Sequence, residues 1–153
     1  MSTGIEIRVG RVERLGQGGI GRAGLVSGWS DTEDAHVWND GATAVMIFGQ
    51  RARPPALTLR VAGAAYLPND THVQDIAIYV NGWWGGFWRM DERITYVLEV
   101  RIEPEWWLAR GDRHVAHISF VMPNAARPSD LSGARDQRRL AFCFRTLEFC
   151  AAT

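Results

Sequence analysis

Apolar and polar residues alternate along most of the chain, the pattern of β-strands with one buried face and one exposed face. The longest run covers 94–102, where every second residue is apolar. Further strands are predicted at 5–14, 25–26, 42–48, 57–61, 73–81, 83–90, 114–122 and 140–149, the last with a β-bulge because its apolar residues change phase. No segment carries a sustained apolar stripe at helical spacing. We therefore expect an all-β chain of roughly eight to ten short strands, forming an antiparallel β-sandwich or a small barrel.

The connections between these strands are rich in glycine, proline and polar residues. Asn81-Gly82 is a strong hairpin signal, because both residue types tolerate a positive φ. The letters of 16–21, GQGGIG, match the dinucleotide-binding pattern GxGxxG, but no helical stripe follows them, so we interpret this segment as a turn. A long polar loop is predicted at 123–137.

Composition limits the partners that the chain can take. Its 153 residues predict a single domain over 1–153, and a formal net charge of zero gives no basic excess for nucleic acid or an anionic membrane. The near-neutral charge permits a homo-oligomer, because little repulsion opposes self-association. All 17 basic residues are arginine, which indicates a GC-rich bacterial genome and excludes lysine chemistry.

Two features bear on the compartment. The N-terminal residues lack the apolar core of a secretory signal, and no window approaches the roughly 18 apolar residues of a membrane span. Cys143 and Cys150 lie in one predicted strand, too far apart for a disulfide, so free and buried thiols are expected. Together these features predict a cytoplasmic protein without a membrane span.

The segment 28–41, GWSDTEDAHVWNDG, is the first candidate site. It combines two tryptophans, four acids and a histidine between two glycines. Trp29 and Trp38 can cover the apolar C–H faces of a sugar, while Glu33 and Asp40 accept hydrogen bonds from its hydroxyls. The alternative is that the two rings close the end of the core and the acids face solvent.

The hairpin at 81–90 is the second candidate site. Trp83 and Trp84 point to opposite faces of a strand, and Trp84 and Trp88 share one face if no bulge intervenes. Two rings on one face predict a platform on which a sugar can stack. The alternative places one ring in the core and the other in a subunit interface.

Asp136 and Arg138 precede the last strand, where a sandwich can bring them to the 28–41 segment. An arginine facing a carboxylate forms a bidentate ion pair. One interpretation is structural, with Glu33 or Asp136 clamping an arginine and fixing the loop. The other has Arg138 binding a carboxylate or phosphate of an acidic glycan.

The acids raise two further hypotheses. Glu33 with Asp40 or Asp136 would suit a glycosidase, which needs two carboxylates about 5 to 9 Å apart across the scissile bond. The carboxylates of Asp31, Glu33 and Asp34 are the oxygen ligands that a structural Ca²⁺ takes.

Five short motifs carry a resemblance to a known family. They are GWSDTE at 28–33, WNDG at 38–41, VNG at 80–82, PSDL at 128–131 and DQRRL at 136–140. In their order and spacing the chain resembles, over about residues 20–150, the β-sandwich module associated with bacterial glycosyltransferases of cell-surface polysaccharide synthesis. The resemblance implies a jelly-roll-like sandwich that binds glycan, with no catalytic residue. We also expect no cofactor.

We therefore expect a non-catalytic carbohydrate-binding module linked to bacterial polysaccharide synthesis or recognition, with a glycan or glycoconjugate as its partner. The predicted contacts are Trp29, Glu33, Trp38, Asp40, Trp84, Trp88, Asp136 and Arg138. The alternative hypothesis is a structural or assembly module whose 81–90 hairpin is a protein–protein interface. A glycosidase is the third.

Overall fold

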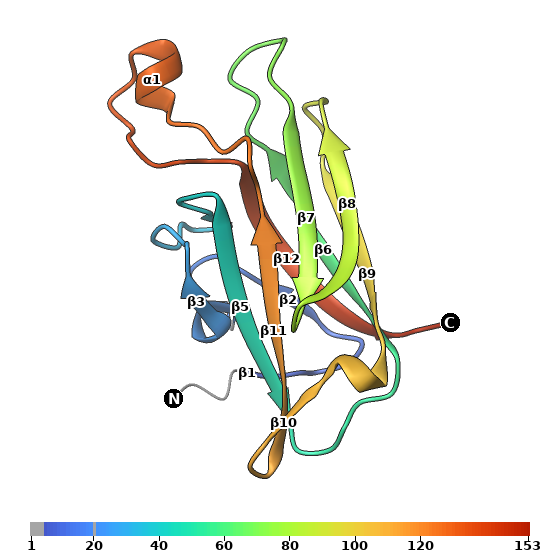
Figure 1. The fold of residues 1–153 in the computed structure, drawn as a ribbon. Helices are drawn as coiled ribbons and strands as arrows, with labels where there is room; N and C mark the ends of the chain where they lie inside the picture. The colour runs from blue at the N-terminus through green and yellow to red at the C-terminus, as the bar shows by residue number, and fades with distance from the viewer. Residues whose placement is uncertain (1–4, 20) are drawn as a thin grey trace.

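A computed structural model describes residues 5–19 and 21–153 and shows two β-sheets packed face to face (Figure 1). The first sheet, in front in Figure 1, has seven strands, and the second has five. Nearly all strand pairs are antiparallel. The predicted all-β sandwich is therefore confirmed.

The first sheet runs in the order β1–β5–β11–β7–β8, with β3 paired to β5 and β10 paired to β11. Its strands are β1 Ile5–Glu6, β3 Leu25–Ser27, β5 Thr43–Gln50, β7 Gln74–Val80, β8 Trp83–Met90, β10 Leu108–Arg110 and β11 Arg113–Val121. Only the β1–β5 pair is parallel among the pairs of this sheet in the described chain. The strand β8 forms one edge.

The second sheet runs in the order β2–β12–β6–β9, with β4 paired to β12. Its strands are β2 Val12–Arg14, β4 Val37–Trp38, β6 Leu57–Ala65, β9 Tyr96–Ile102 and β12 Phe142–Ala151. The register of β12 against β6 shifts between Phe144 and Thr146. This shift confirms the bulge predicted in the last strand.

The core lies between the sheets and consists of the residues that alternation places on the inner faces. Ile78 of β7 and Val100 of β9 have no exposed surface. Phe144 meets Phe120 and Phe142 edge to face, with ring centroids 5.0 and 4.8 Å apart. The contact between Phe120 and Phe144 joins the two sheets, because Phe120 lies on β11 and Phe144 lies on β12.

Two predicted segments differ from the structure. The prediction of one strand over 5–14 is wrong, because the chain turns at 9–10 and passes from β1 in the first sheet to β2 in the second. The predicted loop 123–137 contains a short helix, α1 Pro128–Ser132. Pro128 occupies its first turn, where the fixed φ of proline suits a helix start.

The turns and thiols follow the sequence analysis. Asn81 and Gly82 have φ values of 50° and 85°, which confirms the β7–β8 hairpin turn. The glycine-rich segment continues as a four-residue 3-10 turn, η1 Gly21–Gly24, and not as the long helix that dinucleotide binding requires. Cys143 and Cys150 are both free, Cys143 buried and Cys150 half-buried. None of the helices in the described chain is long and apolar enough to span a membrane.

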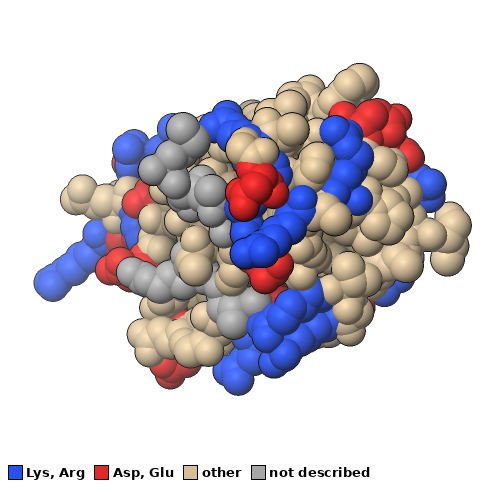
Figure 2. Space-filling model, turned by 90° about the horizontal axis from the view of Figure 1, so that it is seen from below, with Lys and Arg blue, Asp and Glu red and all other residues tan. Residues whose placement is uncertain are grey.

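Charges of both signs are mixed over the surface. At the end of the sandwich seen in Figure 2, arginines lie among acidic and uncharged side chains. Ion pairs join Arg8 to Glu13 at 2.9 Å and Arg60 to Glu99 at 3.1 Å.

Candidate functional site

The segment 28–41 and the residues before β12 meet at one end of the sandwich. The backbone N–H of Arg139 donates to Asp40 Oδ1 at 3.0 Å, and that of Gly41 donates to the carbonyl of Arg139 at 2.9 Å. The structure thus brings together the two segments that the sequence placed side by side. We call this region the loop end, comprising residues 28–41 and 136–142.

A fully buried asparagine, which the sequence analysis missed, holds the loop end together. Asn39 Nδ2 donates to the carbonyls of Gly41 and Arg139, at 2.8 and 3.1 Å. Its Oδ1 accepts from the backbone N–H groups of Ala141 and Phe142, at 2.8 and 2.9 Å. The sequence could flag only the WNDG letters around this residue, because three of its four partners lie about a hundred residues away.

The charged side chains of the loop end are paired with one another. Arg138 forms a bidentate pair with Asp136, with nitrogen–oxygen distances of 3.0 and 2.7 Å. Its Nη1 also lies 3.9 Å from Glu33 Oε2, and Glu33 bonds to the ring of His36 at 3.0 Å. The hydrogen bonds from Arg138 hold the pKa of Asp136 below its ordinary value. This is the clamped arginine of the structural interpretation.

The paired acids do not have the properties of a glycosidase pair. A general acid needs a raised pKa, whereas Arg138 lowers the pKa of Asp136. Asp40 accepts a backbone hydrogen bond, and Glu33 is engaged by His36. Each of the three carboxylates therefore has a structural partner.

The two tryptophans of the loop end pack against other side chains. Trp29 donates its indole N–H to the carbonyl of Val45 at 2.9 Å and meets Phe144 edge to face at 4.8 Å. Its ring belongs to the margin of the core, as in the alternative interpretation of the sequence. Trp38 is half-buried on β4, with His36 and Tyr66 edge to face at 6.1 and 6.2 Å.

The acids proposed as calcium ligands do not converge. Among the described residues, no group of three or more histidine, cysteine or acidic side chains could hold a metal ion. Asp31, Glu33 and Asp34 are exposed, and Glu33 is directed to His36. The geometry gives no support to a calcium site on these three residues.

The strand β8 contains a bulge that changes which aromatic rings share a face. Gly86 pairs with Ile78 and Trp84 pairs with Tyr79, so Gly85 is an extra residue between them. A Cβ at Gly85 would lie 2.6 Å from Val100 Cγ1, which explains the glycine there.

Trp84 and Trp88 were expected to share one face only if no bulge intervened, and the bulge at Gly85 places them on opposite faces. Beyond the bulge, Phe87 pairs with Ala77 and lies on the same outer face as Trp84. Trp88 points inward and packs against the core. Phe87 is therefore the aromatic neighbour of Trp84, which the sequence analysis missed.

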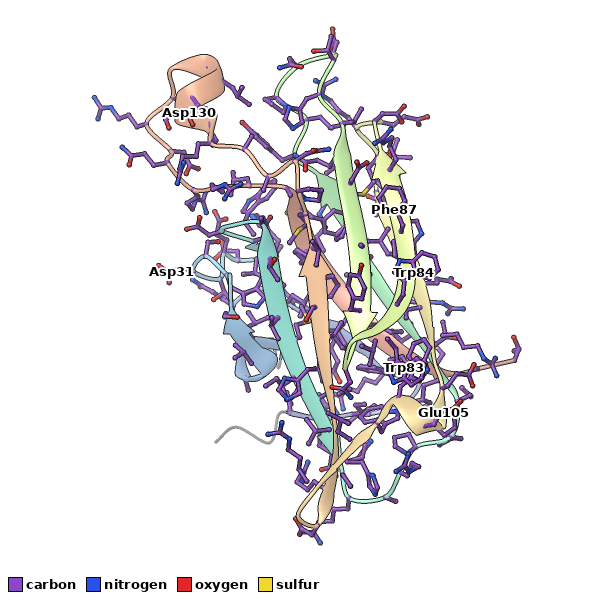
Figure 3. The ribbon with its side chains drawn as sticks, in the orientation of Figure 1. Asp31, Trp83, Trp84, Phe87, Glu105 and Asp130 are labelled. Carbon is purple, nitrogen blue, oxygen red and sulfur yellow. The ribbon has the colours of Figure 1, made fainter. Side chains whose placement is uncertain are left out.

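Strand register places polar side chains beside these two rings on the outer face of the first sheet. One row across the strands contains Trp84, Tyr79, Ser119 and Val45, and the next contains Phe87, Ala77, Val121 and Thr43. We call these eight residues the aromatic face. The side chains of Trp84 and Phe87 are exposed, with exposed fractions of 62% and 51%. Figure 3 shows both on the outer side of β8.

The aromatic face ends at an ion pair. Arg89 Nε and Nη2 donate to the two carboxylate oxygens of Asp75 at 2.7 and 2.8 Å. These hydrogen bonds hold the pKa of Asp75 below its ordinary value. The two charges neutralise each other beside Phe87.

A second aromatic pair lies at the other end of β8. Trp83 stacks on Trp106 with ring centroids 5.8 Å apart and planes 4° apart, and Trp83 is 52% exposed. Trp106 belongs to the 3-10 turn η2, Pro104–Trp106. Asn81 fixes this turn, because its Nδ2 donates to the Trp106 carbonyl at 2.7 Å. The hairpin asparagine thus positions a ring more than twenty residues further along the chain.

No known protein-family model and no curated protein matches this sequence. Among solved structures, the CBM36-1 domain of a multidomain xylanase from the hindgut metagenome of Trinervitermes trinervoides is similar, with a TM-score of 0.50 and 9% identity over 94% of this chain and 98% of that one. A carbohydrate-binding module CBM36 in complex with calcium and xylotriose has a TM-score of 0.44 and 10% sequence identity, and the match covers 95% of this chain and 92% of that one. A family 35 carbohydrate-binding module from an environmental isolate has a TM-score of 0.45 and 12% sequence identity, and the match covers 99% of this chain and 85% of that one. At such identities the likeness establishes the fold alone, a β-sandwich of the jelly-roll type.

Proposed function

We propose that this chain is a non-catalytic carbohydrate-binding module that takes its glycan on the aromatic face. The observation that carries the proposal is the exposure of Trp84 and Phe87 at neighbouring positions of one sheet face. Exposed rings lose unfavourable contact with water when the C–H face of a sugar covers them. The hydroxyls of Tyr79 and Ser119, in the same row as Trp84, supply donors and acceptors for sugar hydroxyls.

We assign a structural role to the loop end. Its charges are engaged with one another, and the ring of Trp29 is held in the core margin. This assignment separates two groups of the residues predicted from the sequence. Trp84 is a ligand contact, whereas Trp29, Glu33, Trp38, Asp40, Asp136 and Arg138 keep the loops in place.

The biological setting is a further part of the proposal. The five motifs that resemble the glycosyltransferase-associated module support a role in bacterial polysaccharide synthesis or recognition, in the cytoplasm. The fold is compatible with that role, since sandwiches of this kind include carbohydrate-binding modules. Synthesis of a cell-surface glycan in cells that lack the gene would test it, and unchanged glycan would refute this setting.

The binding proposal is tested with Trp84→Ala. We expect the variant to lose about 1 to 3 kcal/mol of glycan affinity, the scale for burial of a large apolar side chain. Titration calorimetry measures the loss, and acrylamide quenching of tryptophan fluorescence reports whether the glycan covers exposed rings. Leu131→Ala is the matched control, since Leu131 is 46% exposed but lies on α1. Equal glycan affinity in the wild type and in Trp84→Ala would refute the site.

A second function is favoured by the position of β8 at the edge of its sheet. Its outer backbone edge has no partner strand in the described chain, and three exposed rings lie along it. Aromatic residues are enriched in protein interfaces, and an unpaired edge can accept another strand. The hairpin would then be an assembly interface, as in the alternative hypothesis. In that case Trp84→Ala would change the oligomeric state in sedimentation analysis and leave glycan affinity unchanged.

A further inference from the structure

We propose that the stacked pair of Trp83 and Trp106 is a second glycan-binding site, separate from the aromatic face, so that one module can hold two glycan chains at once. The inference rests on the proposed function for its class of ligand, a neutral glycan. It follows from the side of β8 on which Trp83 lies, from the support beneath its ring and from the polar groups beside it.

Trp83 and Trp84 leave β8 on opposite sides, because successive side chains of a strand alternate. Trp84 pairs with Tyr79 of the aromatic face, whereas Trp83 pairs with Val80, which has no exposed surface and belongs to the core. Trp83 therefore lies at the side of the sandwich where η2 passes from β9 of the second sheet to β10 of the first. A sugar unit that stacks on Trp84 cannot also stack on Trp83.

The ring of Trp83 is supported on one side and open to solvent on the other. Trp106 lies parallel to it, with planes 4° apart and centroids 5.8 Å apart, yet Trp83 is 52% exposed. Trp106 itself is partly buried and packs against the core. A flat exposed ring that rests on a second ring is a surface on which the apolar C–H face of a sugar can stack. Sugar binding would remove this apolar area from water.

Hydrogen bonds from Asn81 fix the support beneath Trp83. Its Nδ2 donates to the carbonyls of Trp106 and Val115, at 2.7 and 2.9 Å. Its Oδ1 accepts from the backbone N–H of His117 at 2.9 Å. One side chain thus ties the β7–β8 hairpin to η2 and to β11. The ring pair is ordered before a ligand arrives, so binding should cost little side-chain entropy.

The polar groups beside the ring pair suit a neutral glycan. Glu105 precedes Trp106 in η2 and is exposed, and Figure 3 shows it at the same end of β8 as Trp83. Its carboxylate can accept hydrogen bonds from sugar hydroxyls. Arg53 donates to the carbonyl of Pro104 at 2.8 Å and so brings a positive charge to the same turn. With one charge of each sign at η2, no net field selects an acidic or a basic sugar.

Two sites on opposite sides of one strand predict two independent binding events. A short oligosaccharide should bind to each ring separately, and loss of one ring should leave the other site intact. A long glycan offers many copies of the same unit, so a module with two sites can join two chains or two stretches of one chain.

The experiment is a two-dimensional NMR titration of isotopically labelled protein, followed at the tryptophan indole N–H signals, with cellotriose, xylotriose and maltotriose as probes. Trp83→Phe and Trp84→Phe assign the two signals, since each variant lacks one of them. We expect at least one trisaccharide to move both signals. In Trp84→Ala the Trp83 signal should report a dissociation constant within about twofold of the wild-type value, and Trp83→Ala should leave the Trp84 signal equally unaffected.

Further variants separate loss of the site from loss of structure. Trp106→Ala removes the supporting ring and should weaken binding at Trp83 by about tenfold or more without a change at Trp84. Trp106→Phe keeps a ring there and should restore most of that affinity. Val97→Ala is the matched control, since Val97 is 53% exposed on β9 and should alter neither site. Circular dichroism confirms that each variant is folded before it is titrated.

The outcomes distinguish the inference from the function on which it rests. Movement of the Trp84 signal alone would overturn the second site and leave the aromatic face in place. Movement of the Trp83 signal alone would support the site at Trp83 and refute the aromatic face. Loss of the Trp83 response in a folded Trp84→Ala variant would indicate one shared site and overturn the inference. No movement of either signal with any of the three probes would overturn both.

Discussion

Replacement of Asn39 by alanine should destabilise the fold strongly although the residue belongs to a loop. The Asn39 side chain is fully buried and makes four hydrogen bonds to backbone groups. Two of these reach the N–H groups of Ala141 and Phe142 at the start of β12. Alanine would leave all four backbone groups without this partner, and the N–H groups of Ala141 and Phe142 lie where both residues are buried.

The magnitude follows from these four bonds. A buried intramolecular hydrogen bond contributes about 1 kcal/mol net, so their loss should cost about 4 kcal/mol. With a urea slope of about 2 kcal/mol per molar for a protein of this size, the midpoint of unfolding should fall by about 2 M. A change of this size is a large share of the stability of a typical domain.

The matched control is the same substitution at an exposed asparagine. Asn69 Oδ1 accepts three hydrogen bonds, from the backbone N–H groups of Thr71 and His72 and from the Thr71 hydroxyl. Water can replace these bonds in the exposed turn, so Asn69→Ala should cost less than about 1 kcal/mol. Urea unfolding followed by tryptophan fluorescence measures both variants. If Asn39→Ala lost no more stability than Asn69→Ala, the argument from burial would be refuted.

Three further predictions concern the strands. Gly63→Ala should lower the free energy of unfolding by at least about 2 kcal/mol, because the new Cβ would overlap the backbone carbonyl of Cys143. Urea titration measures this loss, and an unchanged midpoint of unfolding would contradict the prediction. Hydrogen bonds from Arg89 hold the pKa of Asp75 below its ordinary value of 3.8. The ionised carboxylate therefore stabilises the fold above pH 3.8, and this stabilisation is lost as the pH falls through the lowered pKa. Asp75→Asn should therefore be less stable than wild type at pH 7, with a difference that shrinks in acid unfolding curves below pH 3.8; a constant difference would count against the pair. In the native protein a thiol reagent should modify Cys150 before Cys143, since Cys143 is buried and Cys150 is only half-buried. Mass analysis of the labelled peptides would show the reverse order if this is wrong.

The fold could be predicted from the sequence because alternation reports directly on which side chains face inward. Ile78 and Val100 lie on the inner faces that alternation gave them, and Asn81-Gly82 forms the expected turn. The prediction was wrong at 5–14, where alternation continues through a turn that exchanges one sheet for the other. Alternation fixes the phase of a strand but contains no information on the sheet to which it belongs.

The candidate site was harder to predict, because it depends on neighbours across strands. The pairing of Tyr79 with Trp84 and with Ser119 is a matter of register, which no local pattern in the chain gives. The aromatic neighbour of Trp84 depended on whether β8 contains a bulge, since one extra residue in β8 moves Phe87 outward and Trp88 inward. The adjacent glycines Gly85 and Gly86 were the sequence signal of that bulge, since they lie where the register of β8 shifts.

The same bulge resolves a conflict between binding and solubility. An edge strand with exposed tryptophans can pair with other chains, and an irregular strand with a local twist is less able to do so. Gly85 interrupts the regular edge of β8 while the pairing with β7 continues on both sides, from Gln74 opposite Met90 to Val80 opposite Trp83. The rings therefore sit on backbone that is already ordered, and ligand binding would cost little additional backbone entropy. A loop with the same rings would have to be ordered by its ligand, which is a physical reason to assign glycan binding to the sheet face and a structural role to the loop end.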